Sequence, residues 1–187
     1  MASPVAHSFA GYWIFQFFAQ SKFRLLRFRR GKLLPLGILV VVANLPDFDF
    51  LLSMVIRGNL NDLHRGFTHS LTVAAFVSVV LTLAWPIATP FWGSALVYFT
   101  AYSSHILIDL FTGLRLGWTN SGFGIPLFWP LPQKYSSPLI LIIGVQHQNL
   151  AAVWSIQNAA SGMYELLTFG VITTIILVIR AHYAQDR

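Results

Sequence analysis

Long apolar runs separated by short polar segments dominate this chain. Of its 187 residues, 56% are hydrophobic and only 10% are charged, whereas an ordinary soluble domain is roughly 25% charged. A soluble domain of this size would have to expose large apolar patches. The composition therefore predicts an integral membrane protein that folds as a single membrane-embedded domain over residues 1–187.

The apolar runs predict an all-α, polytopic membrane helix bundle with about five spans. Each span approaches the ~30 Å hydrocarbon core at a rise of 1.5 Å per residue. Ser3 is expected to cap the first helix, and Thr68 is expected to cap the third. The five helices are expected at residues 4–21, 33–45, 69–85, 91–111 and 161–183.

Breaks in the hydropathy pattern divide these helices. Pro46 predicts a kink at the end of the second helix, which resumes over residues 50–57. Residues 113–138 are rich in Gly, Pro and Trp, so we expect a loop at the membrane interface. The apolar run within residues 139–157 is too short to span and is interpreted as a re-entrant or interfacial segment.

Ionisable residues recur where helices begin or end on one side of such a bundle. In an up-and-down arrangement, the starts of the first, third and last helices share a side with the ends of the second and fourth. We therefore expect the residues placed there to converge in one layer. From the first helix to the last, they are His7, Asp47, Asp49, His64, His69, His105, Asp109 and Glu165.

Carboxylates in apolar surroundings must be neutralised by a cation or by protons. Arg65 is one candidate partner, but a single arginine cannot neutralise Asp47, Asp49 and Asp109 together. His105 and Asp109 are four residues apart, so they share a helical face and can present two ligands to one metal. The chain has no cysteine, so imidazoles and carboxylates must supply the ligands.

The sequence therefore predicts one or two divalent ions, with zinc favoured and manganese as the alternative. The predicted ligands are the eight residues of the layer named above. For Glu165, capping of the last helix is an equal alternative. His147 and His182 are interpreted as ordinary packed residues, and Asp62 as a solvated loop residue.

Three motifs resemble those of a known family. The segments "NLPDFDFL", "HRGFTHSL" and "SHILIDLFTG…GIPLFWPL" resemble the YdjM-type family of LexA-regulated, inner-membrane, metal-dependent hydrolases, and the resemblance runs from His7 to about Pro132. That family is distantly similar to zinc-dependent phospholipase C. The similarity implies an ordered ligand series of His7, Asp47 or Asp49, His64 or His69, and then His105 with Asp109.

These features predict a membrane-embedded, metal-dependent hydrolase that cleaves a phosphoester in a lipid or lipid-linked substrate. In this interpretation Asp47 or Asp49 acts as general base. Arg65 holds the phosphate, His64 takes part in catalysis, and Thr68 or Ser70 orients the water. A metal-ion or small-solute transporter and a non-catalytic protein with a structural metal are the alternatives.

Positive charge is concentrated between the first two helices, where residues 22–32 carry six of the twelve Lys and Arg residues. A basic cluster beside a span indicates topology and lipid contact, so no nucleic-acid partner is expected. The positive-inside rule puts this loop in the cytoplasm. The chain is then expected in the inner or plasma membrane with its N-terminus outside, its C-terminus inside and its site near the extracytoplasmic leaflet.

Overall fold

The computed structural model describes residues 1–20, 27–28, 33–58, 64–145 and 154–185. Most of the basic cluster at residues 22–32 lies outside the described residues, as do Asp62 and His147. The described chain is mostly helical, with a few two-residue strands. The helices are α1 (Pro4–Gln20), α2 (Leu33–Asn44), α3 (Asp49–Arg57), α4 (Leu71–Ala84), α5 (Phe91–Leu110) and α7 (Ile156–Gln185).

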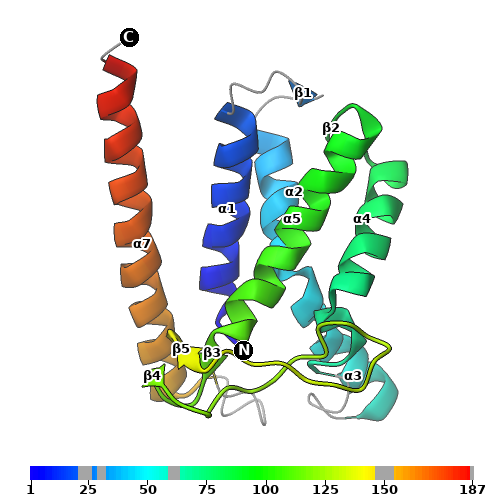
Figure 1. Ribbon diagram of the computed structural model, residues 1–187, viewed down its shortest axis with the longest axis vertical. Helices are drawn as coiled ribbons and strands as arrows, with labels where there is room; N and C mark the ends of the chain where they lie inside the picture. The colour runs from blue at the N-terminus through cyan, green and yellow to red at the C-terminus, as the bar shows by residue number, and fades with distance from the viewer. Residues whose placement is uncertain (21–26, 29–32, 59–63, 146–153, 186–187) are drawn as a thin grey trace.

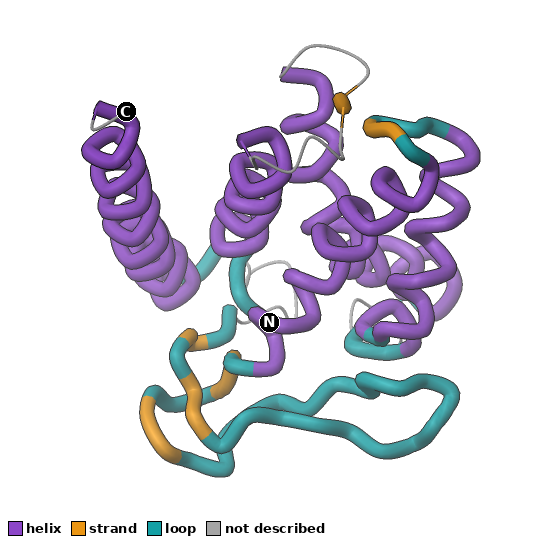
Figure 2. Tube along the Cα trace, turned by 45° about the horizontal axis from the view of Figure 1, so that its top comes forward, coloured by secondary structure: helices purple, strands orange, loops and turns teal. Residues whose placement is uncertain are grey.

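The helices α1, α2, α4 and α5 pack into a bundle, and α7 stands beside it against α1 (Figure 1). Helix α5 is central, because it contacts α1, α2 and α4. Its buried residues Tyr98, Tyr102 and Ile106 pack with Leu39 of α2 in the main core. The long loops and the N-terminus gather at one end of this bundle (Figures 1 and 2).

The break predicted at Pro46 is confirmed. Helix α2 ends at Asn44, and a 3₁₀ turn, η1 (Leu45–Phe48), leads into α3. From the sequence alone, a break at Pro46 allows an extended stretch in which Asp47 and Asp49 share one side. The 3₁₀ turn instead directs the two carboxylates toward different neighbours, because residues two apart in a helical turn do not share a face.

Capping differs in part from the sequence prediction. Ser3 Oγ accepts a hydrogen bond from Val5 N at the start of α1, as expected (3.2 Å). The predicted cap of α4, Thr68, is wrong. Ser70 caps that helix by accepting from Val73 N (3.2 Å), because the short 3₁₀ helix η2 (Phe67–His69) delays the start of α4. The Thr68 hydroxyl does not cap α4 and instead donates a hydrogen bond to Asp49.

Short strands tie the loops together at both ends of the bundle. Thr112–Gly113 (β3) pairs with Ile142–Ile143 (β6), and Gly117–Trp118 (β4) pairs with Leu139–Ile140 (β5). At the opposite end, Arg27–Phe28 (β1) pairs with Ala88–Thr89 (β2). The β-branched isoleucines explain why the first described part of the 139–157 segment forms strands.

Helix α7 begins five residues before its predicted start at residue 161. Ser155 accounts for the difference, because its Oγ accepts a hydrogen bond from Asn158 N (3.2 Å). Such side-chain capping is a standard helix start. Within the described residues, the segments Leu33–Arg57 and Ile156–His182 are long and apolar enough to cross a membrane, and Leu71–Ala84 is a shorter apolar helix.

Close approach of α1 and α2 depends on Gly11, and this dependence is testable. A Cβ at Gly11 would lie 2.8 Å from Leu39 O and from Val40 Cα, whereas a Cβ at Gly37 would meet nothing within 4 Å. We expect Gly11→Ala to destabilise the protein by about 1–3 kcal/mol through overpacking. The matched control Gly37→Ala should be neutral or stabilising by up to ~1 kcal/mol. Thermal unfolding followed by tryptophan fluorescence in detergent measures both, and equal melting temperatures would contradict the close packing.

Candidate metal centre

Four buried side chains from three parts of the chain meet at the loop end of the bundle. Asp47 lies on η1, His69 lies on η2, and His105 and Asp109 lie one turn apart on α5. Each offers one ligand atom, and these atoms all lie within 4.8 Å of one another. The layer predicted from the alternation of helix starts and ends is therefore present for these residues.

The spacing of these atoms fits a tetrahedral ion. The two Nε2 atoms of His69 and His105 are 3.3 Å apart. Asp47 Oδ1 lies 3.5 Å and 3.3 Å from them, and Asp109 Oδ2 lies 3.6 Å and 3.8 Å from them. Ligand atoms at about 2.0–2.1 Å from a tetrahedral zinc ion are roughly 3.3–3.4 Å apart. This buried Asp/His cluster can hold a metal ion.

Unmet hydrogen bonding in this cluster also points to a cation. Both carboxylate oxygens of Asp47 and Oδ2 of Asp109 are buried without a hydrogen-bond partner among the described residues. Buried polar atoms in native proteins nearly always have partners. Carboxylate oxygens can only accept hydrogen bonds. A divalent ion between these oxygens and the two imidazoles would supply the positive partner that the oxygens lack.

His7 faces the opposite oxygens of the same two carboxylates. Its Nε2 lies 3.9 Å from Asp47 Oδ2 and 3.7 Å from Asp109 Oδ1, and its ring stacks on His105 with centroids 3.7 Å apart. Both ring nitrogens of His7 are buried without a hydrogen-bond partner among the described residues. The two aspartates thus each present one oxygen to His69 and His105 and the other to His7.

Asp49 belongs to a second ligand group, with His64 and His69, whose ligand atoms also lie within 4.8 Å of one another and could hold a metal ion. Its Oδ1 lies 2.8 Å from His64 Nδ1, and its Oδ2 accepts a hydrogen bond from Thr68 Oγ1 (2.8 Å). The same Oδ2 lies 3.4 Å from Nδ1 of His69. His69 therefore turns one nitrogen toward the Asp47 cluster and the other toward Asp49. The hydrogen bond of His69 Nδ1 is with Thr68 Oγ1 (3.0 Å), and the Thr68 hydroxyl in turn donates to Asp49. Metal-bound histidines commonly have their second nitrogen oriented by an outer hydrogen-bond partner of this kind.

Competing effects act on the charge of His69. Burial lowers its pKa, but Asp47, Asp49 and Asp109 outweigh burial and raise the pKa to about 9. Without an ion, His69 is therefore protonated at neutral pH and supplies part of the positive charge that the carboxylates require. Binding of a divalent ion has to displace that proton, so the affinity for metal falls as the pH falls.

Arg65 approaches the carboxylates without an ion pair to them within 4 Å among the described residues. Its guanidinium lies over the ring of Phe123, 4.0 Å from the centroid. Its backbone has a φ of 55°, a left-handed conformation that costs a non-glycine residue roughly 1–2 kcal/mol. Strained residues of this kind concentrate at functional sites, and here the strained residue carries a partly buried cation close to the cluster.

Glu165 lies outside both ligand groups. Its carboxylate accepts hydrogen bonds from Ser3 N (2.9 Å) and Ala6 N (3.3 Å), and it also pairs with Ser3 Oγ. A carboxylate at this position stabilises a helix N-terminus. The capping alternative therefore describes its contacts, but Glu165 caps α1 and not the last helix.

Three residues that contact the site were not predicted from the sequence. The backbone carbonyl of Ala43 lies 2.9 Å from His105 Nδ1, which fixes the ring and leaves Nε2 facing the cluster. Tyr102 donates a hydrogen bond to Thr68 O (2.8 Å) and holds the η2 turn in place. Ala2 N donates to Asp109 Oδ1 (2.9 Å). Only Tyr102 had a sequence signal, because it lies three residues before His105 on the same helix.

The two groups should respond differently to isosteric amide substitutions. Asp109→Asn and Asp47→Asn remove a direct ligand and should abolish stoichiometric binding of metal by the purified protein. Asp49→Asn removes an outer partner of His69 and should weaken metal affinity by about 10–100-fold. Elemental analysis and zinc titration measure both effects, with His182→Ala on α7 as the control.

Wild-type protein that is folded, contains no metal and binds none on titration would contradict this site. A loss of metal in Asp49→Asn as complete as in Asp109→Asn would place Asp49 among the direct ligands.

Comparison with known proteins identifies the family. No curated protein and no solved structure matches the chain. The sequence model of the family described as YdjM inner membrane protein matches residues 1–184. The matched segment includes every residue of the candidate metal centre. The chain therefore belongs to the YdjM inner membrane protein family.

Proposed function

We propose that this protein is a membrane-embedded, metal-dependent hydrolase acting on a phosphoester in a lipid or lipid-linked substrate, as a single domain. The observation that best supports this proposal is the pair of buried carboxylates, Asp47 and Asp109. Their oxygens face His69 and His105 on one side and His7 on the other. This arrangement supports one or two divalent ions, and the ligand spacing favours zinc. When bound, such an ion polarises a phosphoryl oxygen and activates water at neutral pH.

The surroundings of the cluster support an anionic phosphoester as the substrate. The guanidinium of Arg65 can donate two parallel hydrogen bonds to a phosphate. Its position above Phe123, beside but not paired with the carboxylates, leaves that capacity for a ligand. Phe48, Phe67 and Trp129 are partly exposed near the same end of the bundle, and aromatic side chains of this kind favour the membrane interface.

Proton transfer is assigned to the second group. The contact of His64 Nδ1 with Asp49 Oδ1 orients the imidazole, and a histidine held in this way suits general acid–base catalysis. Thr68 holds the other oxygen of Asp49, so its hydroxyl serves this carboxylate. Ser70 donates to Phe67 O while capping α4, which leaves it poorly suited to orient water. Asp47 is the alternative base, through its oxygen that faces His7.

Loss of these groups should separate catalysis from metal binding. We expect His64→Ala to retain metal and to lose turnover of a lipid phosphoester by roughly 10²–10⁴-fold. Arg65→Gln should raise KM and lower kcat while metal content is unchanged. Hydrolysis in detergent, with and without chelator, measures these effects, and Arg115→Gln is the control for lost positive charge.

A transporter would behave differently in the same preparation. Metal flux across proteoliposomes without hydrolysis of any lipid phosphoester would contradict the enzyme and support a carrier. Metal binding without either activity would support the structural-metal alternative.

We further propose about five spans, with the N-terminus outside, the C-terminus inside and the metal centre near the extracytoplasmic leaflet. The pairing of β1 with β2 supports a common side for the α1–α2 and α4–α5 connections, at the end away from the metal centre. The basic cluster at residues 22–32 then sets that side as cytoplasmic. Arg57, Arg65, Arg115 and Lys134 lie at the opposite end, but they are spread along the chain.

Cysteine labelling tests this orientation, because the chain contains no cysteine. Leu114→Cys lies in the loop after α5 at the metal end, and Thr89→Cys lies in the connection between α4 and α5. In intact cells we expect an impermeant maleimide to label Leu114→Cys and to label Thr89→Cys only after permeabilisation. The reverse pattern would put the metal centre on the cytoplasmic side.

A further inference from the structure

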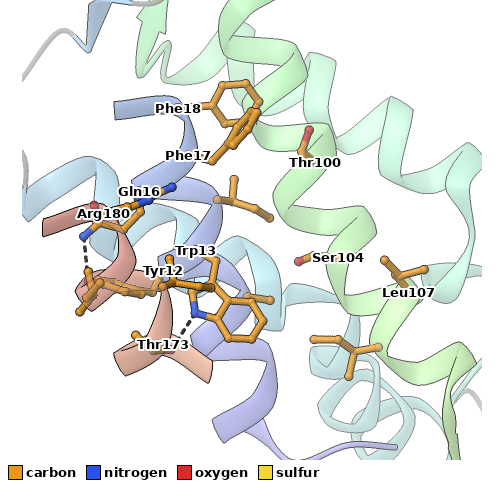
Figure 3. A pocket seen from close by; sticks show the side chains of 15 residues that line it. Tyr12, Trp13, Gln16, Phe17, Phe18, Thr100, Ser104, Leu107, Thr173 and Arg180 are labelled. Carbon is orange, nitrogen blue, oxygen red and sulfur yellow. Dashed lines mark hydrogen bonds between the residues drawn. The ribbon is translucent and has the colours of Figure 1, made fainter. Parts of the chain in front are cut away.

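An apolar groove of about 550 Å³ runs between α1, α5 and α7 (Figure 3), and its lining does not include the α5 ligands His105 and Asp109. Phe17 and Leu107 are among its lining residues. This volume lies within the range of ligand sites, about 300–1,000 Å³. Helix α7 leaves the groove open because it is joined to the bundle mainly through α1, where Trp13 donates to Thr173 Oγ1 (2.7 Å) and stacks on Phe169.

The hydroxyl groups that line the groove do not make it polar. Thr100 donates to Leu96 O (2.8 Å), Ser104 donates to Ala101 O (2.7 Å), and Thr173 donates to Phe169 O (2.7 Å). Each donor is thus satisfied by a carbonyl of its own helix. The wall offers few sites to water, so an apolar chain suits it better.

Polar groups gather at one edge of the groove. Arg180, Gln16 and Tyr12 lie together on the α1–α7 side, across from Thr100 and Ser104 on α5 (Figure 3). Gln16 Nε2 donates to the hydroxyl of Tyr12 (2.8 Å). Arg180 lies toward the C-terminal end of α7, far along the bundle from the metal centre. Its guanidinium carries five N–H donors, enough to serve a phosphate beside other contacts.

The length of the groove matches one leaflet of a bilayer. Its lining on α5 runs from Thr100 to Ile108, about 12 Å at 1.5 Å per residue. Half of a ~30 Å hydrocarbon core is about 15 Å. An acyl chain whose head group lies at Arg180 would therefore fill the groove without reaching the opposite leaflet.

We infer that the groove binds one anionic phospholipid, with an acyl chain between α1, α5 and α7 and its phosphate at Arg180. The lipid replaces the missing protein contacts between α5 and α7. This site is separate from the metal centre and does not depend on hydrolysis. Under the proposed topology, its lipid comes from the cytoplasmic leaflet, where anionic head groups are abundant.

Native mass spectrometry of delipidated protein titrated with phosphatidylglycerol or phosphatidylcholine tests this site. We expect one tightly held lipid per chain and a preference for phosphatidylglycerol of about fivefold, the size expected for one arginine at an anionic surface. Arg180→Gln should remove this preference, whereas Arg57→Gln, which removes the same charge at the metal end, should retain it.

Filling the groove provides an independent variant. Ser104→Phe places a ring against the groove wall and should reduce binding of both lipids at least tenfold, whereas Val80→Phe on the exposed face of α4 should not. Equal affinity for the two lipids, or unchanged binding in Ser104→Phe, would overturn the inference. A groove filled by a second copy of the chain would give dimers without a stoichiometric lipid, and that result would overturn it as well.

Discussion

Three buried aspartates govern this structure, because their charge has to be compensated where apolar helices meet. An ionised carboxylate transferred without a partner into such surroundings costs several kcal/mol. Asp47 and Asp109 face three imidazoles but keep buried oxygens without hydrogen bonds among the described residues. Asp49, in contrast, is satisfied by His64 and Thr68. Asp47 and Asp109 therefore require a cation to compensate their charge, whereas Asp49 is compensated by hydrogen bonds.

The backbone follows from this requirement. A continuous helix through residues 45–49 would satisfy its own hydrogen bonds but would turn Asp47 away from α5. Pro46 removes one donor, and the 3₁₀ turn at η1 brings Asp47 toward His105 while α3 continues from Asp49. The η2 turn does the same for His69, and Tyr102 of α5 holds it through the carbonyl of Thr68. Both 3₁₀ turns, η1 and η2, thus place a candidate metal ligand, Asp47 and His69 respectively, next to α5.

The arrangement of the site was predictable from the sequence because it depends on alternation. Helix starts and ends on one side of a bundle share a layer whatever their packing details, so His7, Asp47, His69, His105 and Asp109 could be grouped from hydropathy. The partners of each individual carboxylate were not predictable from the sequence. The 3₁₀ geometry decides that Asp47 and Asp49 face different partners, and a tertiary contact decides that Glu165 caps α1. The cap at Ser70 was missed because η2 depends on contacts from α5.

Helix α1 connects the metal centre with helix α7. It places His7 at the metal centre. Two contacts join it to α7: Glu165 caps its N-terminus, and its Trp13 donates a hydrogen bond to Thr173. The position of α7 therefore influences how α1 presents His7, although α7 contributes no residue to the ligand groups. On the other side, α7 leaves a groove against α5 that protein atoms do not fill. Occupation of this groove would restrain α7 and, through Glu165 and the first turn of α1, would restrain the side of the metal centre that His7 provides.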